Sequence, residues 1–338
     1  MKKMILSLVA IMMCATATYA QTNLLATLSH NGEITTFYGA NALRDAHETA
    51  EAGDVITLSS GTFNSIDITK GITIRGAGMR INETTQTEPT VISGDVNINI
   101  PTEEEYRLTL EGLYFNNDIH NRCNLNNPLF LKSCFKDLND MMGYGAMTNA
   151  TFIHCRINSV TIRGFASFVN CVLWGLSNSN TNVELINSII HSGSSEGWRY
   201  YSNLSLKNCI LFADRCSSYY AGDIDNCIAY NCISIVNNMP YRGTFSNVSN
   251  SSNIEIEGNG SEIFATFTGS YNDDETFELT EEAQTQYLGI DGTQVGIYGG
   301  SLPYDPTPTN PQITKCNVAA KSTADGKLSV DIEVNAAE

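Results

Sequence analysis

Phe168-Val169-Asn170-Cys171-Val172-Leu173 is the clearest copy of a short motif that recurs along the chain. The motif has an apolar residue, one spacer, a turn-type or small polar residue, a Cys or Ser, and then apolar residues. The other copies are Leu131-Lys132-Ser133-Cys134-Phe135, Phe152-Ile153-His154-Cys155-Arg156-Ile157, Leu185-Ile186-Asn187-Ser188-Ile189-Ile190, Leu206-Lys207-Asn208-Cys209-Ile210-Leu211 and Ile224-Asp225-Asn226-Cys227-Ile228-Ala229. The Cys or Ser recurs in steps of 21, 16, 17, 21 and 18 residues. A repeat this short indicates a solenoid, because propeller blades need roughly 40 residues each.

The turn position of the motif indicates how the solenoid is built. Asn170, and Gly112 in an upstream extension of the motif, tolerate the positive φ of a sharp corner between two short strands. Three such strands per coil give a right-handed parallel β-helix, whose coils stack at about 4.8 Å. We therefore expect an all-β, right-handed parallel β-helix solenoid. A leucine-rich repeat is the alternative, but its signature places two residues between the inner Leu and the Asn, and here there is one.

The same stacking bears on the cysteines. The chain has ten Cys, and nine remain if Cys14 is removed with a leader peptide. Equivalent Cys on adjacent coils would have Cβ atoms about 4.8 Å apart, which exceeds the separation in a relaxed disulfide. We expect an interior file of small unpaired thiols at positions 134, 155, 171, 209 and 227, with Ser188 at the remaining place. Most of the nine should therefore titrate as free thiols in unfolded, unreduced protein.

The first twenty residues read as an export signal. Lys2 and Lys3 precede an apolar run, and Thr18-Tyr19-Ala20 fits cleavage before Gln21. A transmembrane anchor is the alternative, but it would need about 20 apolar residues, and no later segment could span a bilayer. We expect a signal peptide over residues 1–20 and a mature protein that is extracellular, at the cell surface or periplasmic.

A helical pattern over residues 41–53 lies upstream of the motif. After this helix come short strands separated by Gly, as far as Arg75-Gly76-Ala77-Gly78. A short amphipathic helix at that place would cover the open end of the solenoid. The run from Ala42 to Gly78 resembles the opening of right-handed β-helices of the pectin-lyase-like superfamily. Residues 291–300 are similar to the segment that closes many secreted bacterial members. The resemblance implies the fold over about residues 35–300, but it implies no particular activity, because the superfamily holds lyases, hydrolases, esterases and non-enzymatic adhesins.

The resulting division of the mature chain has three parts. Residues 21–302 form the β-helix with its N-terminal capping helix. Residues 303–312 contain Pro303, Pro306, Pro308 and Pro311 and are expected to be a stiff linker. Residues 313–338 contain an Asp325-Gly326 turn between alternating runs and are expected to form a small β appendage.

Charge excludes two classes of partner. The chain has 36 acidic against 19 basic residues, so it lacks the basic surface that nucleic acids or anionic membranes require. Polygalacturonase motifs are missing from the repeat, and Asp273-Asp274 reads as a solvated loop. A pectate-lyase-like site could draw on Arg163, Arg199, Arg215, Asp214, Asp223 and His191, but no family motif surrounds them. Cys227 and Cys232 are a weak basis for a zinc site. We expect no metal and no cofactor, and no catalytic residue can be assigned.

Aromatic residues recur ten positions after the motif Cys or Ser. They are Tyr144, Phe165, Trp198 and Tyr219, with Thr181 as the exception, and Arg163 and Arg199 lie nearby. If they point outward, they form a ribbon suited to stacking on sugar rings. The alternative is an aromatic stack inside the core. These six residues are the candidate ligand-binding residues.

Three functions are compatible with these features. The first is an exported β-helix protein that binds an extended polysaccharide or a cell-surface partner such as a glycan, without catalysis that can be assigned. The second is a polysaccharide lyase or glycoside hydrolase acting on acidic glycans. The third is a structural, adhesin-like surface protein.

Overall fold

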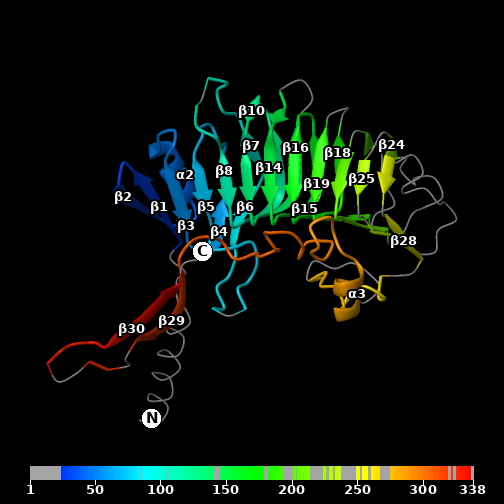
Figure 1. The fold of residues 1–338 in the computed structure, drawn as a ribbon. Coiled ribbons are helices and arrows are strands. Elements are labelled where there is room, and N and C mark those ends of the chain that lie inside the picture. Colours follow the sequence, from blue (N-terminus) through cyan, green and yellow to red (C-terminus); the bar gives the residue numbers. More distant parts are fainter. Residues whose placement is uncertain are drawn as a thin grey trace, which may run out of the picture.

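The protein is a parallel β-solenoid (Figure 1). The computed structural model describes residues 24–83, 85–103, 105–140, 145–178, 182–192, 201–202, 204–213, 224–225, 228–230, 233–236, 249–251, 253–257, 260–266, 275–318, 321–322 and 325–335. The predicted all-β class and the parallel stacking of coils are confirmed. Within these ranges, no helix has the length and apolar character needed to cross a membrane.

Two long sheets form the walls of the solenoid. Sheet A contains, in spatial order, β2 (Glu33–Tyr38), β1 (Leu25–His30), β3 (Val55–Leu58), β5 (Thr73–Arg75), β8 (Thr109–Glu111), β11 (Leu129–Leu131), β14 (Ala150–Ile153), β16 (Ala166–Val169), β19 (Val183–Ile186), β22 (Leu204–Lys207), β25 (Ile228–Tyr230) and β27 (Ser249–Ser251). The strand β1 pairs antiparallel with β2 and β3, whereas the pairs from β3 onward are parallel.

Sheet B runs beside sheet A in the same order of coils. It contains β4 (Gly61–Asn64), β6 (Thr90–Ser93), β9 (Leu113–Asn121), β12 (Cys134–Asp140), β15 (Arg156–Ile162), β17 (Val172–Leu173), β20 (Ile189–Ser192), β23 (Ile210–Ala213), β26 (Ile233–Val236) and β28 (Ile254–Glu257). The strands β7 (Val96–Ile98) and β18 (Leu176–Asn178) pair with the second halves of β9 and β15. Short parallel pairs are formed by β10 (Leu125–Asn126) with β13 (Met147–Thr148), and by β21 (Tyr201–Ser202) with β24 (Ile224–Asp225).

The corner between sheets A and B carries the positive φ that the motif predicts. The corner residues are Gly112 (64°), Lys132 (47°), His154 (55°), Asn170 (50°), Asn187 (46°) and Asn208 (55°). Lys132, and not Ser133, therefore turns the corner in its coil. The residue that follows the corner, Ser133, is the fully buried one, whereas Cys134 begins β12. The placement of Cys134 in the interior file is wrong by one residue, and Ser133 takes its place.

The interior file itself is present as a hydrogen-bonded ladder. Its described members are the fully buried Ser133, Cys155, Cys171, Ser188 and Cys209. Cys171 donates to the carbonyl oxygens of Phe152 (3.4 Å) and Val169 (3.3 Å), and its sulfur accepts from the backbone N–H of Cys155 (3.4 Å). Ser188 Oγ accepts in the same way from the backbone N–H of Cys171, at 3.1 Å. Burial raises the pKa of the Cys155 thiol, and the cysteines of the ladder are in no disulfide.

Because Ser and Cys make the same contacts in the ladder, Cys171→Ser is expected to change the free energy of unfolding by less than about 1 kcal/mol. Cys171→Val removes both the donor and the acceptor and should cost about 2 kcal/mol, since a buried amide loses its partner. Denaturant unfolding under reducing conditions measures both. Equal destabilisation by Ser and Val would show that the hydrogen bonds contribute nothing.

The register shows where the motif continues beyond Cys209. The prediction places residues 224–229 in register with 206–211, but Ile228 pairs with Ser205, and the strand beside Ile210 begins at Ile233. The assignment of position 227 to the file is therefore wrong, although position 227 itself lies outside the described residues. The sequence Tyr230-Asn231-Cys232-Ile233 is the one that matches Lys207-Asn208-Cys209-Ile210.

A second hydrophobic core lies on the outer side of sheet B. Val172, Ile189, Ile210 and Ile233 are buried there against residues of the C-terminal part of the chain. Those residues are Ile263, Phe264, Phe277, Leu279, Ala283, Val295 and Ile297. The short helix α3 (Glu281–Gln286) contributes Ala283 to this core. A strand buried on both faces needs apolar neighbours in succession, which accounts for doublets such as Val172-Leu173 and Ile189-Ile190.

The chain then returns along the corner of the solenoid, in a segment that we call the C-terminal strap (residues 289–310; Figure 1). Its successive residues contact corner residues in reverse order. Asn208 Oδ1 accepts from the N–H of Ile290 (2.9 Å), Asn170 Nδ2 donates to the carbonyls of Ile297 (2.6 Å) and Gly299 (2.8 Å), and His154 Nε2 lies 3.0 Å from the carbonyl of Leu302. Since a carbonyl can only accept, His154 Nε2 carries the proton; burial lowers the pKa of this imidazole.

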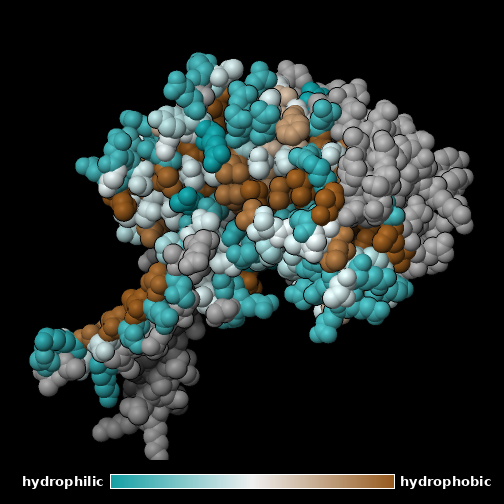
Figure 2. Space-filling view, in the orientation of Figure 1, coloured by the Kyte–Doolittle hydropathy of each residue, from teal (hydrophilic) through white to brown (hydrophobic). Residues whose placement is uncertain are grey.

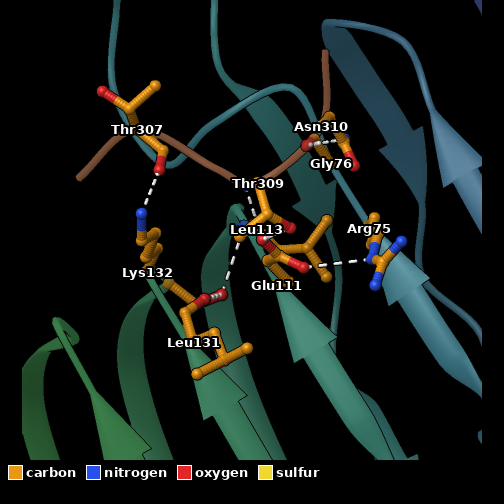
Figure 3. A network of polar contacts seen from close by, with 10 residues as sticks. Arg75, Gly76, Glu111, Leu113, Leu131, Lys132, Thr307, Thr309 and Asn310 are labelled. Carbon is orange, nitrogen blue, oxygen red and sulfur yellow. Dashed lines mark hydrogen bonds and ion pairs between the residues drawn. The ribbon is translucent and has the colours of Figure 1, made fainter. Parts of the chain in front are cut away.

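The end of the strap is held by charged side chains (Figure 3). Lys132 Nζ donates to the carbonyl of Thr307 (2.5 Å). It also donates to Asp305 Oδ2 (3.1 Å). Buried Glu111 accepts from the N–H of Thr309 (2.7 Å) and pairs with Arg75 (3.0 Å). The segment expected to be a Pro-rich linker, residues 303–312, thus lies against the solenoid over most of its length, and the segment 291–300 packs on the side of the solenoid.

At the N-terminal end, α2 (Ala42–Thr49) contacts β1, β2, β3 and β4. Lys70 Nζ donates to the carbonyls of His47 and Ala50, both at 2.7 Å, and so satisfies the C-terminal end of the helix. His47 is buried, and its Nε2 accepts from the N–H of Thr69 (3.3 Å). Burial, and to a smaller extent Lys70, lowers the pKa of His47 to about 4.

His47 should therefore make stability depend on pH. Its pKa is lower in the folded protein than in the unfolded chain, so its contribution is present above about pH 6.5 and is lost as the pH falls toward 4. The loss amounts to about 3 kcal/mol. Denaturant unfolding at pH 7, 5.5 and 4 gives the free energy of unfolding of wild type and of His47→Gln. The contribution of His47 is the difference between the slopes of these two free energies against pH. Identical slopes would show that His47 does not carry this dependence.

Candidate functional site

Two of the six predicted ligand-binding residues lie in the described part of the chain. Arg163 and Phe165 are in the connection from β15 to β16, and the Phe165 side chain is 40% exposed. The backbone N–H of Arg163 donates to Asp140 Oδ2 at 2.9 Å, which places the connection beside the end of β12. Tyr144, Trp198, Arg199 and Tyr219 lie outside the described residues. So do Asp214, Arg215, Asp223 and Asp273-Asp274, together with the side chain of His191.

The chain positions of the four aromatic residues nevertheless agree with one another. Tyr144 falls between β12 and β14, Phe165 between β15 and β16, Trp198 between β20 and β22, and Tyr219 between β23 and β25. Each position is thus in the connection from a sheet B strand to the next sheet A strand. An aromatic stack does fill the interior, but it is made by other residues, among them Phe130, Phe152 and Phe168. Phe165, the described member of the predicted ribbon, is not part of it.

Next to this connection, the second half of sheet B presents a polar outer surface. Ile119, Leu138 and Val160 point into the interior core, so their neighbours along each strand face outward. The register aligns the outward side chains into two files that cross the coils. One file contains Asn97, His120, Asn139 and Thr161, and the other contains Asp118 and Asp137. We call these six side chains the polar face.

Hydrogen bonds position several members of the polar face. Asn97 Nδ2 donates to Asp67 Oδ1 (2.8 Å), and Asn97 Oδ1 accepts from Arg122 Nε (2.6 Å). Within β12, Asn139 Nδ2 donates to Asp137 Oδ1 at 3.1 Å. These contacts use one oxygen of Asp137 and one amide hydrogen of Asn139, and both groups have further capacity. The strand backbone beneath them keeps the spacing between files regular.

The electrostatics of the polar face are acidic. Asp118 is 40% exposed, and its Oδ1 lies 3.9 Å from Lys136 Nζ, a loose pair in solvent. Asp67 and Asp137 add two further carboxylates to the same region. His120 Nδ1 is buried without a hydrogen-bond partner among the described residues. The arrangement therefore offers carboxylate and amide oxygens and amide hydrogens to a ligand that carries hydrogen-bond donors.

Asp140 lies beneath this surface and has a structural role. It is buried, and it accepts from Asn121 Nδ2 (2.8 Å) and from the backbone N–H groups of Met147 and Arg163. Burial raises the pKa of this carboxyl, while these donors act in the opposite direction. Asp140 thereby fixes the backbone at Met147 and at Arg163, two residues before Phe165.

No group of three or more His, Cys, Asp or Glu that could hold a metal ion is found in the described ranges. Cys227 and Cys232, the weak candidates for a zinc site, lie outside those ranges. The polar face can accept and donate hydrogen bonds at several points along one line. Such an arrangement suits the recognition of repeated hydroxyl groups.

The sequence contained a signal for the polar face that motif counting missed. Asp118-Ile119-His120 and Asp137-Leu138-Asn139 alternate polar and apolar residues, as a strand with one wet face does. Because the coils differ in length, a constant period could not show that these two segments lie side by side. The register was needed to bring the two segments side by side.

Comparison of the chain with protein-family models, with curated proteins and with solved structures found no match.

Proposed function

We propose that the protein binds an extended neutral polysaccharide or cell-surface glycan along the polar face, with the connection that carries Phe165 at its border. The observation that carries this proposal is the alignment of Asn97, His120, Asn139 and Thr161 across four neighbouring strands. Neighbouring strands lie about 4.8 Å apart, so four of them offer a line of polar groups roughly 14 Å long. A chain of sugars presents hydroxyl groups repeatedly in the same way, and the exposed ring of Phe165 can stack on a sugar at the edge.

The charge of the surface favours a neutral ligand. Asp67, Asp118 and Asp137 would repel uronate or sulfate groups. Two cations lie in the same region. Arg122 Nε already donates to Asn97, and Lys136, whose side chain is 55% exposed, lies near Asp118, so neither is set up to hold an acidic ligand. Carboxylates and side-chain amides are, in contrast, good partners for neutral hydroxyl donors.

The other two functions remain proposals with less support. A lyase or hydrolase acting on acidic glycans would need cations at the substrate carboxylate, and the polar face is acidic. The side-by-side Asp118 and Asp137 are the described carboxylates on which an acid–base mechanism would depend. A structural, adhesin-like role requires no binding site, so it does not explain why the polar side chains of the polar face are aligned.

Finer features of the fold belong to the same proposal. We infer that the solenoid is right-handed, because parallel strands joined by crossovers in one sheet almost always are. The packing of α2 against β1–β4 supports its role as the N-terminal cap. On this basis we group the protein with the pectin-lyase-like β-helices, exported through the signal peptide of residues 1–20, with residues 313–338 as a C-terminal appendage.

The test is binding to a panel of neutral and acidic polysaccharides by affinity electrophoresis. Asp137→Ala and Phe165→Ala are each expected to weaken binding to a neutral glycan at least tenfold, about 1.4 kcal/mol. Glu184→Ala is the matched control, since it removes an acid from the outer side of sheet A, where Glu184 pairs with Lys207. Binding confined to acidic polysaccharides, or equal losses in Asp137→Ala and Glu184→Ala, would refute the proposal.

A further inference from the structure

The C-terminal hairpin presents an apolar surface that the solenoid does not cover. The strands β29 (Gln312–Val318) and β30 (Val330–Asn335) form a separate two-stranded antiparallel sheet that projects from the solenoid (Figure 1). Every residue of β30 is exposed. A two-stranded hairpin is marginally stable in water unless a further strand or layer covers its apolar face.

The apolar residues of β30 lie on one face. Val330, Ile332 and Val334 alternate with polar residues, and Leu328 continues the row before the strand. These four side chains are 50–53% exposed, and Figure 2 shows a hydrophobic band along the hairpin. Alternation of this kind is typical of a strand with one buried face. Exposed apolar rows on an otherwise hydrophilic protein usually mark a contact surface.

The outer edge of β30 offers a second kind of contact. In the part of the chain that the structure describes, β30 has β29 as its only neighbouring strand. Its opposite edge therefore has the geometry that accepts an added strand through main-chain hydrogen bonds. The base of the hairpin is anchored, because Asn310 Nδ2, two residues before β29, donates to the carbonyl of Gly76 at 2.8 Å.

The charges on β30 distinguish between possible occupants of this edge. Asp331 and Glu333 are both acidic and exposed; within the hairpin Glu333 lies opposite Lys315 of β29 and Asp331 lies opposite Asn317, so an added strand would meet them from the other side. If two copies of the chain paired antiparallel about Ile332, Asp331 of each would stand opposite Glu333 of the other. Parallel in-register pairing would place each acid opposite itself. Like charges directly opposite destabilise a strand pair, so a second copy is a poor occupant, whereas a strand with basic residues is a good one.

We propose that β30 is a docking strand for another protein, which adds a strand whose apolar residues alternate with Lys or Arg. The apolar row of the added strand extends the row of Val330, Ile332 and Val334, and its basic residues face Asp331 and Glu333. This surface is distinct from the polar face, so the two proposals can fail independently.

The experiment uses the full chain and three synthetic seven-residue peptides. The peptides are alternating Lys-Val, alternating Glu-Val, and the Lys-Val peptide interrupted by a central Pro. Fluorescence anisotropy is expected to show binding of the Lys-Val peptide at least tenfold tighter than either control, and hydrogen exchange should show slowed amides in β30. Ile332→Lys should abolish this binding, while Asp331→Lys/Glu333→Lys should reverse the preference between the Lys and Glu peptides.

A matched variant tests the specificity of the site. The strand β2 is also an edge strand with an exposed apolar residue, Ile34, so Ile34→Lys should leave peptide binding unchanged. Equal effects of Ile34→Lys and Ile332→Lys would overturn the proposal. It would also be overturned if the wild type formed a dimer in sedimentation, or bound phosphatidylcholine vesicles, in a manner lost in Ile332→Lys. Binding to neutral glycans should be the same in wild type and Ile332→Lys.

Discussion

Phe152→Ala, a truncation in the interior of the solenoid, is expected to lower the free energy of unfolding by about 4 kcal/mol. Phe152 is fully buried, and its ring stacks between Phe130 (centroids 4.6 Å apart) and Phe168 (4.5 Å). Its removal loses apolar burial and two ring contacts, and it leaves a cavity that strands pinned by hydrogen bonds on both sides cannot close. Denaturant unfolding followed by circular dichroism measures the loss.

Two further variants make this prediction specific. Phe152→Leu keeps most of the volume and should cost about 1–2 kcal/mol. Phe165→Ala, at a 40% exposed position in the connection before β16, should cost less than about 1 kcal/mol. Similar losses in Phe152→Ala and Phe165→Ala would show that the interior stack is not a main source of stability.

Asn170→Asp is expected to release the C-terminal strap and to cost at least about 3 kcal/mol at neutral pH. Asn170 is buried, and its amide nitrogen donates to the carbonyls of Ile297 (2.6 Å) and Gly299 (2.8 Å). A carboxylate of the same shape would direct negative charge at two carbonyl oxygens and would have no donor in place of the amide. The expected signs are faster hydrogen exchange and easier proteolysis within residues 289–310.

The pH dependence of this variant has a definite sign. Burial and the facing carbonyls would raise the pKa of the introduced Asp, so the penalty should shrink as the pH falls below that raised value. Asn149→Asp is the matched control, because Asn149 has nearly the same φ (55°) but is exposed and lies away from the strap. Asn149 Nδ2 donates to Asn127 Oδ1 at 3.2 Å in solvent, so this control should cost less than about 1 kcal/mol. A strap equally protected in wild type and Asn170→Asp would show that the corner amides do not hold it.

The corner column explains why one residue type serves two purposes. Asn170 and Asn208 each adopt positive φ, which their sequence positions predicted, and each also binds the returning strap. The corner position turns these side chains outward while the next residue, such as Cys171, turns inward to the ladder. The same two-residue unit therefore builds the interior of the solenoid and the seat for its C-terminal segment.

The candidate site could be predicted only in part. The connection that carries Arg163 and Phe165 follows from counting residues after each motif, because the outward or inward direction of a side chain repeats once per coil. The polar face cannot be predicted by such counting, because the number of residues per coil varies. Asp118 and Asp137 are 19 residues apart, whereas residues aligned across the next pair of coils are further apart in the chain. Whether Tyr144, Trp198, Arg199 and Tyr219 belong to the site stays a prediction.

The sequence by itself determined the architecture. Asn, Gly and small Cys or Ser residues at short intervals specify corners and an interior file, because backbone φ and side-chain size are local properties that residue type controls directly. Only the tertiary structure decided that Ser133 and not Cys134 enters the file, since the corner in that coil falls on Lys132.

Only the tertiary structure, likewise, brought the strap onto the corner column and the C-terminal residues onto sheet B. Contacts such as that between Asn208 and Ile290 join residues far apart in the chain, and a single sequence carries no record of which distant segments pair. Local residue properties therefore allow the solenoid to be predicted from the sequence. Which of its surfaces are covered and which stay exposed depends on long-range packing.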